Sequence, residues 1–183
     1  MRSPRRAERG FSLVELMLTI AFAATVLTIA VPVMTDVSDS SKLNAAAREI
    51  EREFQSARLK SVSANRLLRV WLNCPGTGMY RTVEYLATSD DTRTDRCSDS
   101  ASAFPFPPDN DIMTRPNFDG PVRMLPLGAT VTSSILQFQP DGTAVTIVSN
   151  VVTPITTPVT ITVTRKGKSK AITVNAAGKI QLQ

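Results

Sequence analysis

The chain has 183 residues, 42% of them hydrophobic, a formal net charge of +5 and no histidine. That length suits one anchoring segment and one small globular domain. Without histidine the chain lacks the commonest general base and a common metal ligand, so composition argues against an enzyme and predicts neither a cofactor nor a metal site.

The first predicted element is a membrane-spanning helix over residues 11–34. A basic leader, residues 1–10, ends at Gly10, and the apolar run that follows contains one charged residue, Glu15. At 1.5 Å per residue this helix would be roughly 36 Å long, enough to cross a hydrocarbon core of ~30 Å. The arginine-rich leader should stay cytoplasmic and leave the rest of the chain in the periplasm. A carboxylate inside such a run is costly, so Glu15 is a functional candidate that needs a partner.

Three alternatives compete with this spanning helix. A secretory signal peptide could be cleaved near Ala21-Phe22-Ala23, but the apolar run continues for about ten residues beyond it and Glu15 would interrupt its apolar core. A twin-arginine signal at Arg5 and Arg6 lacks the residues that should follow it. An ordinary single-span anchor explains the apolar run but leaves Glu15 without a role.

Residues 35–64 are predicted to continue the helix as an amphipathic segment. Apolar residues recur there at spacings of three and four and define one face: Leu43, Ala46, Ala47, Ile50, Phe54 and Ala57. The opposite face should be a solvated set of charges: Lys42, Arg48, Glu49, Arg52 and Glu53. We expect one helix over about 11–64 that is kinked or loosened near Pro32, where a backbone donor is missing, although residues 38–41 could instead cap a separate helix.

From residue 65 the pattern changes to short β-type segments, which make residues 65–183 a β-rich globular domain. Strands are expected at 67–72, 81–86, 122–125, 129–132, 135–138, 144–148, 159–164, 171–174 and 180–182. Turn signals rich in glycine and proline separate most of them. The predicted fold is therefore α+β: a long N-terminal helix, transmembrane and then amphipathic, packed on a β-sandwich-like head.

The connection over residues 87–121 is polar and rich in proline and aspartate, which predicts a surface loop. Its aspartates do not follow the spacing of an ordered calcium loop, so a solvated loop is the preferred interpretation. Cys74 and Cys97 are the only cysteines, and in a periplasmic domain such a pair is most simply a disulfide, with two buried free thiols as the alternative.

The N-terminal residues Gly10-Phe11-Ser12-Leu13-Val14-Glu15-Leu16, after a basic leader, resemble the processing site of type IV pilins and type II secretion pseudopilins. The resemblance implies cleavage by a prepilin peptidase between Gly10 and Phe11, followed by N-methylation of Phe11. It also implies that Glu15 pairs with the amino terminus of a neighbouring subunit during assembly. Pro32 is similarly placed to a proline at which pilin helices loosen.

The C-terminal third resembles the GspH/FimT group of minor pseudopilins and minor pilins. The matching residues are Phe138-Gln139-Pro140-Asp141-Gly142-Thr143 and the closing segment Gly178-Lys179-Ile180. The resemblance implies a structural or assembly subunit of a type II secretion pseudopilus or a type IV pilus, held in the inner membrane by a single span. Its implied partners are other pilin or pseudopilin subunits, the prepilin peptidase and the inner-membrane assembly machinery.

A basic cluster near the C-terminus supports an alternative function. All charges after Asp141 are positive: Arg165, Lys166, Lys168, Lys170 and Lys179. Such a patch can neutralise phosphates, and some FimT-like minor pilins bind DNA near this region for DNA uptake. A solubilising hairpin tip or a contact with an acidic neighbouring subunit explains the same charges.

Overall fold

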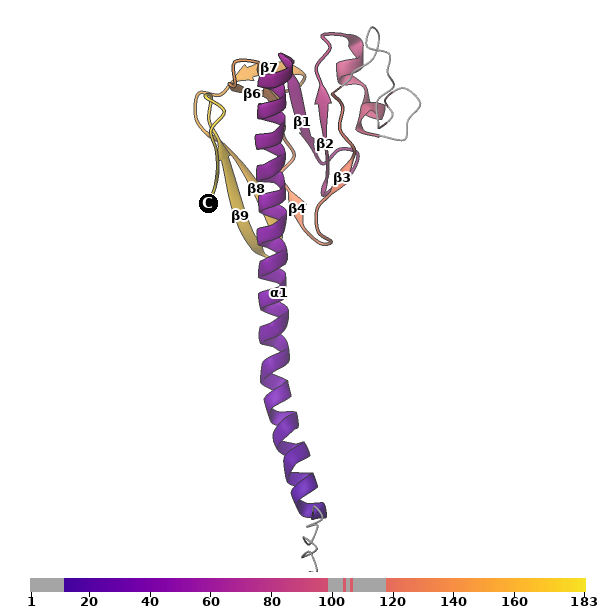
Figure 1. Ribbon diagram of the computed structural model, residues 1–183, viewed down its shortest axis with the longest axis vertical. Helices are drawn as coiled ribbons and strands as arrows, with labels where there is room; N and C mark the ends of the chain where they lie inside the picture. Colours follow the sequence, from indigo (N-terminus) through magenta and orange to yellow (C-terminus); the bar gives the residue numbers. More distant parts are fainter. Residues whose placement is uncertain (1–11, 99–103, 105, 107–117) are drawn as a thin grey trace, which may run out of the picture. The chain divides into compact units, whose positions relative to one another are not determined.

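The computed structural model describes residues 12–98, 104, 106 and 118–183, without the side chains of residues 29, 31–33, 94 and 95. Two compact units, residues 1–38 and 39–183, divide the chain within the long helix α1 (Leu13–Ala64). The second unit, which we call the head, contains the C-terminal part of α1 and two antiparallel sheets. The α+β class predicted from the sequence is confirmed (Figure 1).

Helix α1 is continuous from Leu13 to Ala64, so residues 38–41 do not start a separate helix. It ends where Asn65 adopts φ 52°, the left-handed conformation that often terminates helices, and the Arg66 amide donates to the Ser61 carbonyl. Among the described residues, no helix is both long and apolar enough to span a bilayer. The structure does not describe Phe11 or the side chains of 29 and 31–33, which belong to the predicted membrane segment over 11–34. Both this membrane segment and the kink at Pro32 therefore stay predictions.

The C-terminal part of α1, residues 39–64, packs its apolar face on the sheets of the head, as predicted. All six residues of the predicted apolar face are buried: Leu43, Ala46, Ala47, Ile50, Phe54 and Ala57. The rings of Phe54 and Phe138 lie 6.2 Å apart between centroids. Figure 1 shows this part of α1 crossing in front of the strands, with β8 and β9 on one side and β1 and β2 on the other.

The strands of the head form two sheets. The six-stranded sheet has the order β3-β2-β1-β5-β6-β7, and the four-stranded sheet has the order β10-β9-β8-β4. The bounds are β1 (Leu68–Leu72), β2 (Met79–Glu84), β3 (Arg123–Met124), β4 (Thr130–Val131), β5 (Ile135–Phe138), β6 (Ala144–Val148), β7 (Val151–Pro154), β8 (Val159–Arg165), β9 (Lys168–Val174) and β10 (Ile180–Leu182). Buried residues of both sheets and of α1 belong to one hydrophobic core.

Strand β7 was not predicted, and its turn explains how it forms. Ser149 and Asn150 have φ of 49° and 63°, so the two residues between β6 and β7 form a tight hairpin turn in which both backbones are left-handed. All four residues of β7 are exposed at the edge of the six-stranded sheet. The strand therefore lacks the alternation of buried and exposed residues on which strand prediction depends.

The described part of the 87–121 connection is not simply a solvated loop, which corrects the prediction. It contains two short 3-10 helices, η1 (Ser89–Thr92) and η2 (Thr94–Cys97). Asp91, Arg96 and Asp119 are buried, with exposed fractions of 4%, 0% and 3%. Buried charged side chains therefore help to fasten this connection to the head, together with the buried ring of Phe104.

Candidate functional site

The predicted processing site falls outside the part of the chain that the structure describes. Gly10 and Phe11 are outside the described residues, whereas Glu15 lies in the first turn of α1 with an exposed side chain. Every described side chain over residues 12–38 is exposed, including Leu13 at 74% and Phe22 at 73%. The described side chains of this stretch are mostly apolar, and a large exposed apolar patch typically marks an interaction site.

Hydroxyl groups within this N-terminal part of α1 are satisfied by the helix itself. Thr19, Thr25 and Thr28 each donate to the carbonyl oxygen three residues earlier, at 2.7–2.8 Å. A threonine that bonds its own helix can enter an apolar environment without leaving a donor unpaired. Glu15 is the one charged residue between residues 12 and 35.

Two glutamates predicted to lie on the solvated face of α1 instead contact the sheet. The Tyr80 hydroxyl donates to Glu49 at 2.6 Å, and the Thr82 hydroxyl donates to Glu53 at 2.5 Å. Arg123 pairs with the other oxygen of Glu53 at 2.9 Å. Burial of the phenol, with the Glu49 carboxylate beside it, raises the pKa of Tyr80. These bonds hold α1 against β2 and β3 at the flank of the apolar face.

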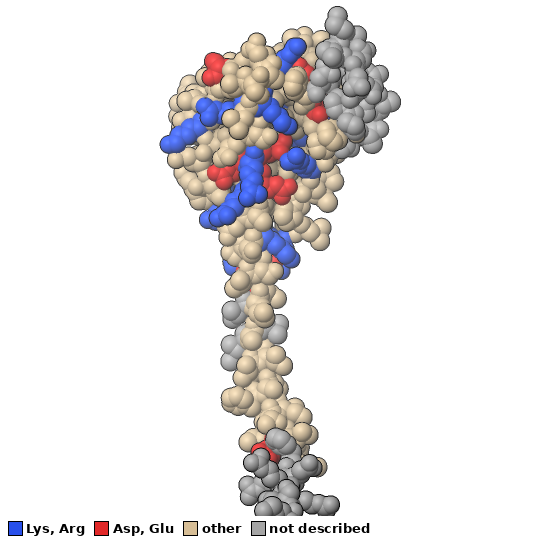
Figure 2. Space-filling view, in the orientation of Figure 1, with Lys and Arg blue, Asp and Glu red and all other residues tan. Residues whose placement is uncertain are grey.

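The remaining charges of α1 form a mixed surface. Lys42, Arg48 and Arg52 are exposed, as predicted. Figure 2 shows basic and acidic side chains interleaved over the head on the side where α1 lies.

The turns that resemble the GspH/FimT pattern meet at Arg58, which the sequence analysis did not single out. Its Nε donates to the Gly142 carbonyl at 2.9 Å, and its terminal nitrogen donates to the Ala177 carbonyl at 3.3 Å. A Cβ at Gly178 would clash with the Gly142 carbonyl oxygen and lie 2.8 Å from Arg58 Nε, so only glycine fits there. The two turns and the end of α1 therefore form one close-packed junction.

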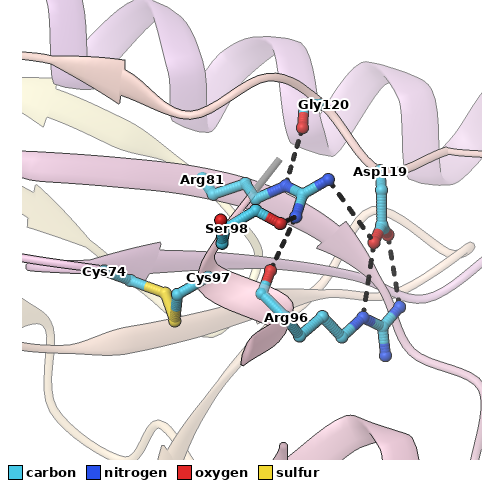
Figure 3. The surroundings of a disulfide bond; sticks show 7 residues. All are labelled: Cys74, Arg81, Arg96, Cys97, Ser98, Asp119 and Gly120. Atoms are coloured by element: carbon cyan, nitrogen blue, oxygen red, sulfur yellow. Dashed lines mark hydrogen bonds and ion pairs between the residues drawn. A yellow bond between two sulfur atoms is a disulfide. The ribbon is translucent and has the colours of Figure 1, made fainter. Parts of the chain in front are cut away.

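A buried group of charges lies beside the disulfide, and we call it the buried charge cluster: Arg81, Arg96, Asp91 and Asp119. Figure 3 shows Arg81, Arg96 and Asp119 of this cluster next to the disulfide. Arg96 pairs with Asp91 at 2.8 Å and with Asp119 at 3.2 Å. The Arg81 guanidinium donates to the carbonyl oxygens of Arg96 and Gly120, both at 2.7 Å. Arg96 also donates to the Glu84 carbonyl. The two arginines and two aspartates thus neutralise one another. Arg81 also donates to backbone carbonyls of the 87–121 connection, and the aspartates accept from backbone amides of Glu84, Leu86 and Thr88.

The predicted disulfide is present: Cys74 and Cys97 are joined. It links the residue two positions after β1 to the last residue of η2, directly after Arg96. The covalent bond and the buried charge cluster therefore fasten the same segment to the sheet.

The predicted basic cluster is divided by the structure. Arg165 and Lys166 both pair with Asp39 of α1, Arg165 at 3.0 Å and Lys166 at 2.8 Å. Hydrogen bonds from Lys166 and then Arg165 hold the pKa of Asp39 below its ordinary value. The Arg165 side chain is 8% exposed and also donates to the Leu127 carbonyl. Arg165 is therefore a buried link between β8 and α1 rather than part of an open cationic surface.

Lys179 lies apart from the other four cations, directly before strand β10, which adjoins β9. Lys168 begins β9, whereas Lys179 lies in the turn after β9, where its amide donates to the Asn175 side chain at 2.9 Å. Strand β9 has seven residues, so its two ends lie about 20 Å apart at 3.3 Å per residue.

Among the described residues, no three histidine, cysteine, aspartate or glutamate side chains come together in a way that could hold a metal ion. Residues 99, 109 and 111, three aspartates of the acidic connection, lie outside the described part of the chain.

Comparisons with known proteins give one family and several similar structures. A family model described as type II transport protein GspH matches residues 46–178. The type IV minor pilin FimU of Pseudomonas aeruginosa is 18% identical, with 80% of this chain and 92% of that chain covered and a TM-score of 0.48. The minor pseudopilin EpsH of the Vibrio cholerae type 2 secretion system is 13% identical, with 78% and 96% covered and a TM-score of 0.45. The comparison with curated proteins gave no match.

Proposed function

The chain belongs to the family of the type II transport protein GspH, and on that premise we propose that it is a minor pilin or pseudopilin that assembles through its N-terminal helix. Its role is structural: it is a subunit of a type II secretion pseudopilus or of a type IV pilus. Before assembly, residues 11–34 hold it in the inner membrane as a single span, with the leader cytoplasmic and the head periplasmic.

The observation that carries this proposal is the difference in burial along α1. Residues 39–64 bury an apolar face on the sheets, whereas every described side chain over 12–38 is exposed. An exposed apolar helix is unfavourable in water, since each large apolar side chain left uncovered forgoes roughly 1.5–3 kcal/mol of burial. Lipid would bury these apolar side chains before assembly, and the helices of neighbouring subunits would bury them afterwards.

Processing follows from the same helix. Cleavage between Gly10 and Phe11 removes the arginine-rich leader and gives the helix a free amino group. An α-amino group has a pKa of about 8 and is largely protonated at neutral pH. That charge, next to the apolar helix, is the partner that Glu15 lacks in a single chain, and the two pair between neighbouring subunits.

The test is assembly of the full chain in a cell that carries the peptidase and the assembly machinery. We expect Glu15→Ala to be processed normally, with the leader absent by mass spectrometry of the N-terminal peptide, but to be lost from cross-linked filaments. Glu8→Ala is the matched control, because it removes an acid from the leader that cleavage discards. Normal assembly of Glu15→Ala would remove the proposed role of Glu15, and an intact leader in the unchanged chain would remove the processing site.

DNA uptake is the alternative, supported by Lys168, Lys170 and Lys179 and weakened by the pairing of Arg165 and Lys166 with Asp39. DNA binding by the full chain in uncharged detergent micelles, measured over a salt series, separates the two functions. Binding that weakens with salt and disappears when Arg165, Lys166, Lys168 and Lys170 are replaced by alanine would favour DNA uptake. Absence of binding at low salt would leave the assembly subunit alone.

A further inference from the structure

We propose that the β8–β9 hairpin binds the anionic phosphate headgroups of the bilayer that holds the chain's own N-terminal helix. The hairpin surface consists of Lys166, Lys168 and Lys170, and it would act while the subunit is still in the membrane. This inference rests on the proposed function, because it requires residues 11–34 to be a membrane segment.

The chain itself brings the hairpin close to the end of that segment. Lys166 Nζ lies 2.8 Å from the Asp39 carboxylate, and Asp39 follows Met34 by five residues. Five helical residues rise about 7.5 Å, and even a fully extended chain of that length spans no more than ~18 Å. The headgroup layer on each side of a bilayer is roughly 5–8 Å thick. Because residues 34–39 are helical, Asp39 and the Lys166 side chain that contacts it lie about one headgroup layer from the end of the membrane segment.

The charge of this end of the head fits an anionic surface. Lys166 has a side chain that is 68% exposed even while it contacts Asp39, and Lys168 is exposed at the start of β9. Lys170 lies two residues further along β9 and is half-buried, and Lys42 follows Asp39 by three residues on α1. Between residues 34 and 42 the acids are Asp36 and Asp39, and no acid occurs in the chain after Asp141.

The backbone holds these lysines in place. Lys166 and Gly167 have φ of 46° and 76°, the two left-handed residues of a tight turn, and Lys168 pairs with Arg165 across it. No heavy atom of the head lies within 4 Å of a Cβ built at Gly167, so the tip is open to an approaching surface. Arg165 is a positioning residue: its bonds to Asp39 and Leu127 tie the base of the hairpin to the head.

Such a contact would be modest for each lysine and useful in sum. A lysine near an anionic membrane favours the bound state by roughly fivefold. This preference falls off with distance over about one Debye length, and added salt shortens that length. The hairpin would therefore limit the orientations of the head at the bilayer and release it when neighbouring subunits draw the helix out.

The experiment uses the full chain reconstituted into vesicles of phosphatidylcholine alone or mixed with an equal amount of phosphatidylglycerol. An amine-reactive reagent labels the lysines, and mass spectrometry gives the labelling rate of each. We expect Lys166, Lys168 and Lys170 to be labelled about fivefold more slowly in the anionic vesicles at low salt, with the protection lost at high salt. Lys60 and Lys179 are internal controls, since Lys179 lies at the far end of β9 and both should label equally in the two membranes.

Variants test the same surface by a different measurement. Amide hydrogen exchange of β8 and β9 should be slower in anionic than in zwitterionic vesicles for the unchanged chain and for the Lys60→Gln/Lys179→Gln control. The difference should vanish in Lys166→Gln/Lys168→Gln/Lys170→Gln, which alters no buried side chain. Equal labelling of the hairpin lysines in both membranes would overturn the proposal.

Two other outcomes would also overturn the hairpin–lipid contact. Only the second of them would also contradict the proposed membrane segment. If double-stranded DNA, but not anionic lipid, protects the three lysines, the hairpin is a nucleic-acid surface. If an alkaline wash strips the chain from the vesicles, the membrane segment itself is wrong and the proposed function loses its anchor. A chain that resists the wash while its lysines label equally would refute the hairpin contact alone.

Discussion

Two groups of ion pairs in the head differ in how completely they are buried. In the buried charge cluster, Arg96 is 0% exposed and holds two aspartates, whereas at the hairpin the Lys166 side chain is 68% exposed and shares Asp39 with Arg165. Buried charges must be paired within the fold or they destabilise it, while exposed ones exchange readily with water and salt. The first group therefore belongs to the architecture, whereas in the second the exposed Lys166 can also reach a partner.

The largest effect is expected from breaking the buried cluster. Arg96→Met would leave Asp91 and Asp119 buried without their shared partner and should lower the free energy of unfolding by roughly 3–5 kcal/mol. Urea unfolding followed by the fluorescence of the single tryptophan, Trp71, measures the loss.

Arg93→Met is the matched control for that substitution. Arg93 pairs with Asp90 at 3.5 Å, but the two side chains are 47% and 39% exposed. A surface pair of this kind contributes about 1 kcal/mol at most. Similar losses in the two variants would contradict the distinction between the two groups.

Removing the disulfide should have the next largest effect. That effect should be confined to the segment next to the buried charge cluster. The two cysteines are 23 positions apart, and opening a loop of that size costs about 3 kcal/mol on the chain-entropy model. In Cys74→Ser/Cys97→Ser we expect amide hydrogen exchange to rise in η1 and η2 while the β8–β9 hairpin keeps its protection. An equal rise in both segments would mean that the disulfide supports the whole head.

The smallest effect concerns the pKa of Asp39. The folded-state pKa of Asp39 lies below its ordinary value of 3.8. The ion pairs of Asp39 with Arg165 and Lys166 therefore stabilise the head fully above pH 3.8, and this stabilisation is lost as the pH falls through the folded-state pKa. Lys166→Gln should raise the pKa of Asp39 toward its ordinary value, and added salt should do the same. A carboxyl NMR titration measures the change.

Lys170→Gln serves as the control for that titration. Lys170 lies on the same hairpin but pairs with Val163 across the strands, and no interaction with it contributes to the pKa of Asp39. If both substitutions moved the pKa equally, the general charge of the hairpin, rather than the contact with Lys166, would be responsible.

Patterns with a short period were predictable from the sequence. The spacing of Leu43, Ile50 and Phe54 identified the face of α1 that is buried, because a helix places residues three and four apart side by side. Glycine also marked turns between predicted strands, and one of them, at Lys166 and Gly167, joins β8 to β9. The cysteine pair was predicted correctly because only one pairing is possible within the chain.

Charges were predicted less well. Glu49 and Glu53 were expected in solvent, although Tyr80 and Thr82, about 30 positions away, donate to them (separations of 31 and 29). The aspartates of the acidic connection were expected to be hydrated, yet Asp91 and Asp119 are buried against Arg96. The junction at Arg58 was missed for the same reason, since its contacts lie 84 and 119 positions away.

By itself, the sequence determined the helix, its buried face, most strands, the cysteine pair and the family resemblance at both ends of the chain. Only the tertiary structure decided which charges are paired, as with Arg165 and Asp39, which are 126 positions apart. Periodicity and turn chemistry act between near neighbours, so a sequence displays them directly. The burial of a charge depends on which distant segment the fold brings against it, and no local pattern carries that information.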